Sequence, residues 1–250
     1  MNGVRILAAG EQGIVIELGN TICTDINARV HKLAKGLVDT MGSDIVEVVP
    51  TYRSLLVYFD PLQIQRQQLV KYIENVIANE KLDEVELLQS KVVNIPVCYD
   101  DEFGPDLQFV AQYNGLTVDE VITIHTASPY LVYMLGFTPG FPYLGGMSER
   151  IATPRLEKPR TRIVAGSVGI AGSQTGFYPI DSPGGWRLIG RTPLRAFQPE
   201  AAQPFLFDAG VYLQFQAINR QEYDEIKQVV AAGRYVATTG TLILGGANHD

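Results

Sequence analysis

The spacing of apolar residues divides the start of the chain into short strands and an amphipathic helix. "VRILAA" and "GIVIEL" are short apolar runs on either side of the turn residues 10–13, which predicts two strands. A helix is expected next, with Asp25 as its N-cap, because its carboxylate can accept hydrogen bonds from the first free N–H groups. The apolar stripe of this helix is formed by Ile26, Val30, Leu33, Leu37 and Val38.

The same order is then repeated. "IVEVVP" and "SLLVYFD" predict two strands, and Asp60-Pro61 predicts the start of a second helix. The apolar face of that helix is formed by Leu62, Leu69, Ile73, Val76 and Ile77. The order ββαββα is typical of a small α+β domain in which helices cover one face of an antiparallel sheet. We therefore expect an N-terminal domain at residues 1–88, with the charged segment 79–91 as its boundary.

The pattern changes in residues 89–250. "VVNIPVCYD" predicts a strand, and two short helices follow, separated by Asn114-Gly115, the second with a capping box of Thr117 and Glu120. Short β-like runs between glycines and prolines extend from Ser128 to Phe215, and "QEYDEIKQVVAAG" predicts a last helix. Many short strands with frequent turns predict a barrel or a sandwich with two inserted helices. We expect this second domain to span residues 89–250.

Composition narrows the class of protein. A net charge of −7 and a pI near 5.0 argue against nucleic acid as a partner. No stretch approaches the roughly 18 apolar residues of a membrane span, and no signal peptide is apparent, so we expect a cytoplasmic protein that is not bound to a membrane. Cys23 and Cys98 lie in unrelated contexts and predict reduced, structural thiols. The three histidines lack metal-ligand spacing, so no metal is predicted on this chain.

Positive charge gathers in residues 150–195. This segment contains eight lysine and arginine residues against two carboxylates, a net charge of +6, so the rest of the chain carries −13. Seven of the eight are arginines, whose planar guanidinium pairs with a carboxylate or phosphate. If the fold brings these arginines together, we expect them to form a binding site for a small oxyanion. The alternatives are a solvated basic surface or a docking surface for an acidic partner.

Within this segment, "QTGFYPIDSPGGWRLIGRTP" (174–193) contains the candidate polar chemistry. On a regular strand, Arg187 and Arg191 point to the same side and can hold one anion or two different groups, unless they are edge-strand charges. Asp181 can orient an arginine or act as a base, although its surroundings are also ordinary turn chemistry. Trp186 is interpreted as a core or rim aromatic, or else as a stacking platform.

A second unusual stretch is "GFTPGFPYLGG" (136–146), which is uncharged. Prolines and glycines around Phe141 and Tyr143 favour a rigid aromatic loop that walls a pocket, or a packed loop under the barrel. "GSVGIAG" (166–172) misses the spacing of both common phosphate-binding loops. The chain therefore has no nucleotide-binding signature of its own.

These two stretches, together with "PRLEKPRTRIVAGSVGIAGS" and "FDAGVYLQF", closely resemble the family of 5-oxoprolinase B subunits. That family is also named allophanate hydrolase subunit 1 or KipI-type kinase inhibitor. The resemblance implies a small N-terminal α+β domain followed by a cyclophilin-like β-barrel. It also implies a component that is inactive alone and acts with the A subunit and a KipA-like C subunit to open 5-oxoproline to L-glutamate using ATP.

The two motifs supply the candidate site residues. Phe141, Tyr143 and Trp186 are expected to line the substrate site, and Gln174 and Tyr178 to position polar groups. The expected catalytic residues are Arg187 and Arg191, which would hold carboxylate or phosphoryl oxygens, and Asp181, which would orient these two arginines. ATP is expected to bind elsewhere or at a subunit interface. No biotin-acceptor Met-Lys-Met occurs, so we expect no biotin on this chain.

Three other functions remain open at this point. The first is inhibition of a sporulation sensor histidine kinase through protein–protein binding, with the barrel docking a helical kinase domain. The second is participation in another amide or urea-type hydrolase, such as allophanate hydrolase. The third, prolyl isomerisation, depends on the implied fold alone.

Overall fold

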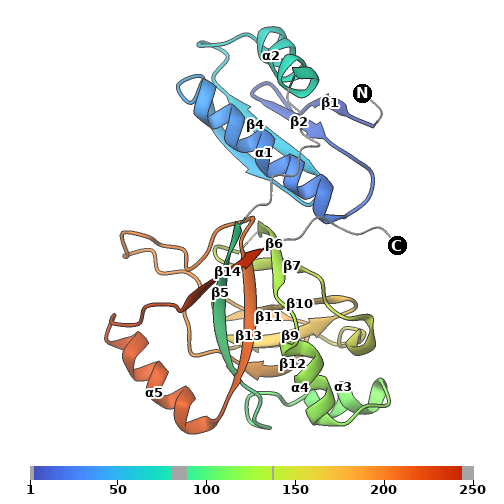
Figure 1. Ribbon diagram of the computed structural model, residues 1–250, viewed down its shortest axis with the longest axis vertical. Helices are drawn as coiled ribbons and strands as arrows, with labels where there is room; N and C mark the ends of the chain where they lie inside the picture. The colour runs from blue at the N-terminus through green and yellow to red at the C-terminus, as the bar shows by residue number, and fades with distance from the viewer. Residues whose placement is uncertain (1–2, 80–88, 137, 244–250) are drawn as a thin grey trace. The chain divides into compact units, whose positions relative to one another are not determined.

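The chain divides into two compact units, of which the first includes Met1–Leu88 and the second is Gln89–Ile243. The computed structural model describes residues 3–79, 89–136 and 138–243. Most of the expected boundary segment, residues 80–88, lies outside the described residues. Each unit is therefore described by itself (Figure 1).

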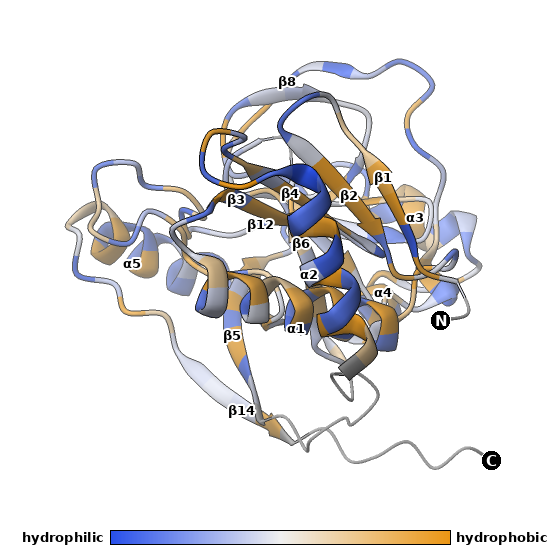
Figure 2. Cartoon of the chain, turned by 90° about the horizontal axis from the view of Figure 1, so that it is seen from above, coloured by the Kyte–Doolittle hydropathy of each residue, from blue (hydrophilic) through white to orange (hydrophobic). Residues whose placement is uncertain are grey.

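The first unit is a four-stranded antiparallel sheet with two helices. In spatial order the strands are β1 (Arg5–Ala8), β2 (Gly13–Glu17), β4 (Ser54–Phe59) and β3 (Ile45–Pro50). The helices are α1 (Thr24–Met41) and α2 (Arg66–Asn79). Both carry polar and apolar residues (Figure 2), and the apolar ones share a core with Ile16, Leu55 and Val57 of the sheet. The predicted order ββαββα is confirmed.

The helix starts differ from those expected. Cys23, not Asp25, is the N-cap residue of α1, and no side chain caps this helix; Asp25 lies in its first turn, where a carboxylate favours the helix dipole. The second helix begins at Arg66 because Asp60 forms a turn instead, its Oδ1 accepting the Leu62 N–H at 2.9 Å. Leu62 is consequently 90% exposed rather than part of the apolar stripe. Val38, expected in the stripe of α1, is also exposed.

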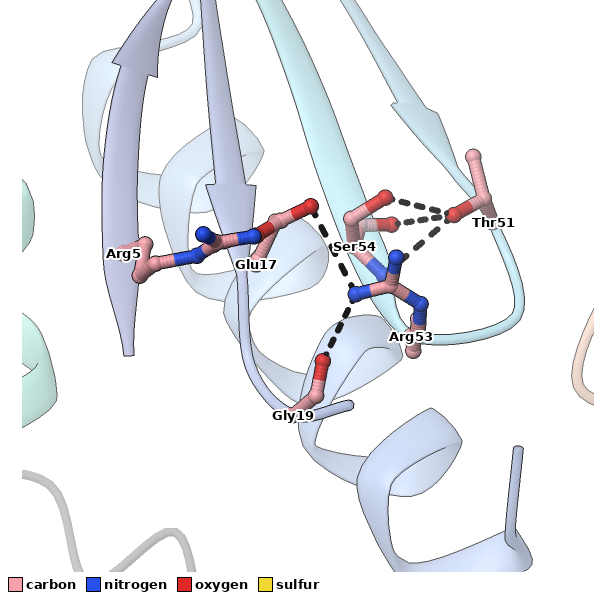
Figure 3. A network of polar contacts seen from close by, with 6 residues as sticks. All are labelled: Arg5, Glu17, Gly19, Thr51, Arg53 and Ser54. Atoms are coloured by element: carbon pink, nitrogen blue, oxygen red, sulfur yellow. Dashed lines mark hydrogen bonds and ion pairs between the residues drawn. The ribbon is translucent and has the colours of Figure 1, made fainter. Parts of the chain in front are cut away.

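Charged residues connect three strands at one end of this sheet (Figure 3). The Glu17 carboxylate accepts a hydrogen bond from Arg5 Nε at 2.7 Å and lies 3.5 Å from Arg53 Nη1. Arg53 also donates to the Gly19 carbonyl at 2.8 Å. Such partly exposed ion pairs contribute little to stability, so their main effect is on the alignment of β1, β2 and β4.

The second unit is built on one eight-stranded sheet. Along the sheet the strands are β10 (Gln174–Phe177), β9 (Ser167–Ala171), β12 (Arg187–Arg191), β5 (Gln89–Cys98), β13 (Tyr212–Ile218), β6 (Tyr130–Leu135) and β7 (Pro142–Gly145), with β14 (Thr239–Ile243) paired to β5. A Cβ atom placed on Gly176 of β10 would lie 3.2 Å from the carbonyl oxygen of Pro142 in β7. The two ends of the sheet therefore meet, and the sheet is barrel-like and nearly closed.

Short elements complete this unit. They are α3 (Leu107–Tyr113), α4 (Val118–Thr126), a 3-10 turn (Glu149–Ile151), the strand pair β8 (Arg160–Ile163) and β11 (Ser182–Gly184), and α5 (Arg220–Ala231). The predicted capping box of Thr117 and Glu120 begins α4, and Gly233, with φ of +67°, follows the end of α5. The α+β class is confirmed. None of the helices in the described ranges is long and apolar enough to cross a membrane.

Candidate functional site

Strands β10, β9 and β12 present two chemically different faces. Cross-strand pairing places Thr175 opposite Ile170 and Phe177 opposite Val168, and these four side chains form the core face. The pairs Gln174–Ala171 and Gly176–Gly169 lie on the other side, which we call the aromatic face. Directly opposed residues of an antiparallel pair share a face, so Leu188, opposite Gly169, also belongs to the aromatic face.

The aromatic face takes its name from Phe141 and the three rings around it. The centroid of Phe141 lies 5.5 Å from that of Tyr143, 5.7 Å from that of Tyr178 and 5.5 Å from that of Trp186, in tilted or edge-to-face geometry. Phe141, Tyr178 and Trp186 are buried, whereas Tyr143 and Gln174 are half-buried. The structure thus brings the five expected substrate-binding residues to one face, as a packed aromatic layer with a partly polar edge.

The glycines of both motifs make room for these rings. A Cβ atom on Gly184 would lie 2.3 Å from the Tyr178 hydroxyl, and one on Gly136 would lie 2.1 Å from a Tyr143 ring carbon. Both distances are shorter than any real contact, so these positions accept only glycine unless the rings move. The density of glycine in the two motifs therefore reflects aromatic packing as well as turns.

Tyr178 provides a polar group within the aromatic layer. Burial raises the pKa of its hydroxyl, while a hydrogen bond with the Trp186 N–H and the nearby positive charges of Arg155 and Arg160 act in the opposite direction. The hydroxyl is therefore neutral near pH 7. Within the aromatic layer, the hydroxyl is therefore close to one backbone donor, from Trp186, and to two arginine side chains.

A buried carboxylate holds the backbone of this layer, and sequence analysis missed it. Asp106, just before α3, accepts a hydrogen bond from Arg160 Nη2 at 3.0 Å and one from the Leu188 N–H at 2.7 Å. Its own N–H donates to the Leu188 carbonyl at 2.9 Å, and Arg160 Nη1 donates to the Trp186 carbonyl at 3.3 Å. No local pattern marks Asp106, because its partners lie 54 and 82 positions further along the chain.

The expectation that Arg187 and Arg191 share a face is wrong. Leu188 pairs with Gly169 but Gly190 pairs with Val168, so Ile189 forms a β-bulge. One extra residue inverts the alternation of side chains, which places the two arginines on opposite faces. The Arg187 guanidinium lies 3.8 Å from the ring centre of Phe109 in α3, whereas the Arg191 guanidinium lies 4.7 Å from the ring centre of Phe103.

Asp181 orients Arg162, whereas the sequence predicted that it orients Arg187 and Arg191. Its Oδ2 accepts hydrogen bonds from Arg162 Nε at 3.0 Å and Nη2 at 2.7 Å, and its Oδ1 accepts the Ala165 N–H at 2.8 Å. These hydrogen bonds, that of Ala165 first, lower the pKa of Asp181. The charge of Arg191 also lowers the pKa of Asp181, so these two residues are near each other. Arg187 lies on the opposite face of the strand, so the three expected catalytic residues are not gathered around one point.

A histidine beneath the core face has a structural role. His125 is completely buried, with Nδ1 2.7 Å from the Tyr99 hydroxyl and Nε2 2.8 Å from the Thr175 hydroxyl. Burial lowers the pKa of His125 to about 3, so its ring is neutral. Among the described residues, no cluster of His, Cys, Asp or Glu side chains is arranged to hold a metal ion.

The fold and this face define a mixed α+β protein in which a nearly closed, barrel-like sheet carries a layer of aromatic rings on one side. Residues 4–207 match the family described as carboxyltransferase domain, subdomain C and D. The chain belongs to this family, and within it to the B subunits of 5-oxoprolinase. The resemblance noted in the motifs is thereby confirmed.

Two curated relatives cover nearly the full length. The chain is 44% identical to the 5-oxoprolinase B subunit of Bacillus subtilis over 233 residues, covering 90% of this chain and 97% of that protein. It is 38% identical to the 5-oxoprolinase B subunit of Escherichia coli O157:H7, covering 86% and 96%. More distantly, it is 23% identical over 258 residues to urea amidolyase of Saccharomyces cerevisiae, covering 91% of this chain but 14% of that protein.

Solved structures share the fold of this chain. The crystal structure of TTHA0988 matches with a TM-score of 0.73 and 34% identity, over 83% of this chain and 40% of that chain. This chain thus corresponds to less than half of TTHA0988. The structure of PH0987 from Pyrococcus horikoshii matches with a TM-score of 0.52 and 51% identity, over 88% of this chain and 100% of that chain.

Proposed function

We propose that this chain is the B subunit of a cytoplasmic, ATP-dependent 5-oxoprolinase that opens 5-oxoproline to L-glutamate together with the A and C subunits. The observation that carries the proposal is the 44% identity to the B. subtilis protein of that name, over 90% of this chain and 97% of that protein. In this proposal the chain is inactive alone, and ATP binds on a partner or at an interface.

The need for ATP follows from the substrate. A lactam carbonyl is a poor electrophile, and transfer of a phosphoryl group from ATP to its oxygen makes the carbon open to attack by water. The transfer itself releases ADP. Addition of one water then breaks the ring C–N bond and leaves an acyl phosphate, which a second water hydrolyses to glutamate and phosphate. The aromatic face suits the apolar ring of such a substrate, and Gln174 and the Tyr178 hydroxyl suit its amide. Because Arg187 and Arg191 lie on opposite faces, they serve different groups in this proposal, such as a carboxylate and a phosphoryl oxygen.

The test is ATP-dependent release of glutamate from 5-oxoproline by the A and C subunits, with and without this chain. We expect release only when all three are present. Equal release without this chain would contradict the proposal. The residue roles are tested separately with Arg187→Ala and Arg191→Ala in the reconstituted complex, and full activity in both variants would remove the arginines from the mechanism.

Substrate binding has its own readout, because Trp186 is the only tryptophan of this chain. Adding 5-oxoproline to the assembled complex formed with a chain that carries Gln174→Ala should change Trp186 fluorescence only at concentrations several-fold higher than for the wild type. Identical titration curves would remove Gln174 from the substrate site. The matched control is Gln228→Ala, an exposed glutamine on α5 outside this face.

A second candidate, a component of a urea- or allophanate-type hydrolase, is favoured by the likeness to urea amidolyase. Replacing 5-oxoproline with allophanate in the same three-component assay separates the two. Ammonia release from allophanate without glutamate release from 5-oxoproline would favour the second candidate.

A further inference from the structure

The exposed side of α3 carries two aromatic rings. Phe109 is 40% exposed and Tyr113 is 56% exposed, and their rings stack with centroids 6.0 Å apart. They are four residues apart and so lie on one side of the helix, whereas Leu107 and Val110 bury the other side. Two adjoining exposed aromatics on a short helix form an apolar patch that is costly to leave in water.

One of these rings is in contact with an arginine. The Arg187 guanidinium lies over Phe109, and its Nε donates to the Pro154 carbonyl at 3.3 Å. The segment that contains Pro154 runs beside α3, joined to it by Asn114 Nδ2 with the Thr153 hydroxyl at 3.0 Å and by the pair of Arg160 with Asp106. Arg155 and Lys158 are exposed residues of this segment, and the exposed Glu157 lies between them in the sequence.

These cations have no negative partner in the part of the chain that the structure describes. No carboxylate there forms an ion pair with Arg155, Lys158 or Arg187, whereas other cations do form one, among them Arg5, Lys35, Arg53, Arg160, Arg162 and Arg220. We name the patch formed by Phe109, Tyr113, Arg155, Lys158 and Arg187 the α3 patch. Tyrosine and arginine are the residues that most often dominate binding energy at protein interfaces.

The charge of the α3 patch indicates what covers it. Unpaired cations around aromatic rings complement a protein surface with carboxylates around an apolar centre. A symmetric pair of copies of this chain is a poorer fit, because the patch would then meet the same positive charges.

The relatives indicate that the occupant is another component of the complex. The region matching this chain is 40% of the TTHA0988 chain and 14% of yeast urea amidolyase, so in those proteins it is covalently continuous with further domains. In the proposed complex, this chain reaches its partners through non-covalent contact. We infer that the α3 patch is the docking surface for a partner protein of the complex, which presents an acidic surface with an apolar centre. The identity of that partner, as the A or the C subunit, rests on the proposed function.

The experiment measures binding of this chain to the purified A and C subunits, each separately, by biolayer interferometry at low and high salt. One variant removes the rings (Phe109→Ser with Tyr113→Ser), and another reverses the charge (Arg155→Glu with Lys158→Glu). We expect each variant to bind one of the two partners at least tenfold more weakly. The charge variant should also lose most of the salt dependence, because screening weakens only the charged contacts.

Matched controls carry the same changes elsewhere. Lys71→Glu with Arg234→Glu repeats the charge reversal at exposed positions, and Leu62→Ser with Val236→Ser removes two exposed apolar side chains. Both should bind like the wild type, and the fluorescence of Trp186 and the urea midpoint report whether each variant is folded.

Two results would overturn the inference. One is that both patch variants bind the two partners as tightly as the wild type, and the other is that the wild-type chain binds neither partner. Glutamate release by the three-component mixture is measured independently. If glutamate release still requires this chain, the proposed function stands even when the docking inference fails. If release does not require this chain, both the proposed function and the docking inference fail.

Discussion

The core face and the aromatic face are made by the same three strands but are built on different principles. On the core face, Val168, Ile170 and Phe177 are buried, and His125 and Thr175 pair their polar atoms with each other or with close neighbours. On the aromatic face, glycines replace branched residues and large rings fill the space. The comparison shows that one side of the sheet is packed with apolar and hydrogen-bonded residues, whereas the other carries aromatic rings with the half-buried Gln174 and Tyr143 at their edge.

Unpaired polar atoms show the same difference. Ser167 and Arg191 are cross-strand partners on the aromatic face, and Ser167 Oγ and Arg191 Nε are buried without a hydrogen-bond partner in the described structure. A buried polar atom without a partner costs free energy, so this side of the sheet is not optimised for stability alone. The predictions below test how far this difference extends.

The largest effect is expected from Phe177→Ala on the core face. Phe177 is completely buried and packs edge-to-face on Phe207 at 5.9 Å. Its loss should lower the free energy of unfolding by about 3–5 kcal/mol. Gln174→Ala, on the same strand but at a half-buried position of the aromatic face, should change it by less than about 1 kcal/mol. Urea denaturation measures both, and similar losses for the two variants would contradict the division into faces.

A smaller loss is expected when the carboxylate that holds the aromatic layer is removed. Asp106→Ala removes the carboxylate that pairs with the partly buried Arg160 side chain and accepts the buried Leu188 N–H. The loss should cost about 2–3 kcal/mol of the free energy of unfolding. Asp181→Ala breaks the exposed pair with Arg162 and should cost no more than about 1 kcal/mol. Thermal unfolding of the two variants side by side would refute this ranking if Asp181→Ala proved the more damaging.

The core face should also make the protein sensitive to acid. Because the pKa of His125 is about 3 in the fold and about 6.5 in an unfolded chain, the unfolded state alone takes up a proton between these values. This group should therefore lower the free energy of unfolding by about 1.4 kcal/mol for each pH unit below 6.5. Urea titrations from pH 7 to pH 5 should show a shallower slope for His125→Gln, and an unchanged slope would mean that His125 does not contribute.

The smallest effects should differ in sign between the faces. Ser167→Ala removes a buried hydroxyl without a partner and should leave stability unchanged or raise it by up to about 1 kcal/mol. Thr175→Val removes a hydroxyl that contacts His125 Nε2 at 2.8 Å and the Gly169 carbonyl at 3.1 Å, and should cost about 1–2 kcal/mol. Differential scanning calorimetry resolves shifts of this size, and a loss at Ser167 equal to that at Thr175 would contradict the prediction.

Local patterns predicted most of the elements of this protein. The ββαββα order, the two helices around Asn114-Gly115 and the capping box at Thr117 depend on neighbours within a few residues, and all are present. The start of α2 was wrong because the side chain of Asp60 bonds its own local backbone more readily than it begins a helix. The aromatic residues of the candidate site contact one another because the two motifs that contain them, residues 136–146 and 174–193, form strands and loops that pack together.

The sequence by itself determined the types of residue available: rings with glycines beside them and, in residues 150–195, eight lysine and arginine residues against two carboxylates. Only the tertiary structure decided how those residues are used. The bulge at Ile189 separates Arg187 from Arg191, and Asp106 is joined to Arg160 across 54 positions. The reason is physical: strand register and pairing between distant segments are set by how the whole sheet closes and packs, and no short stretch of sequence contains that information.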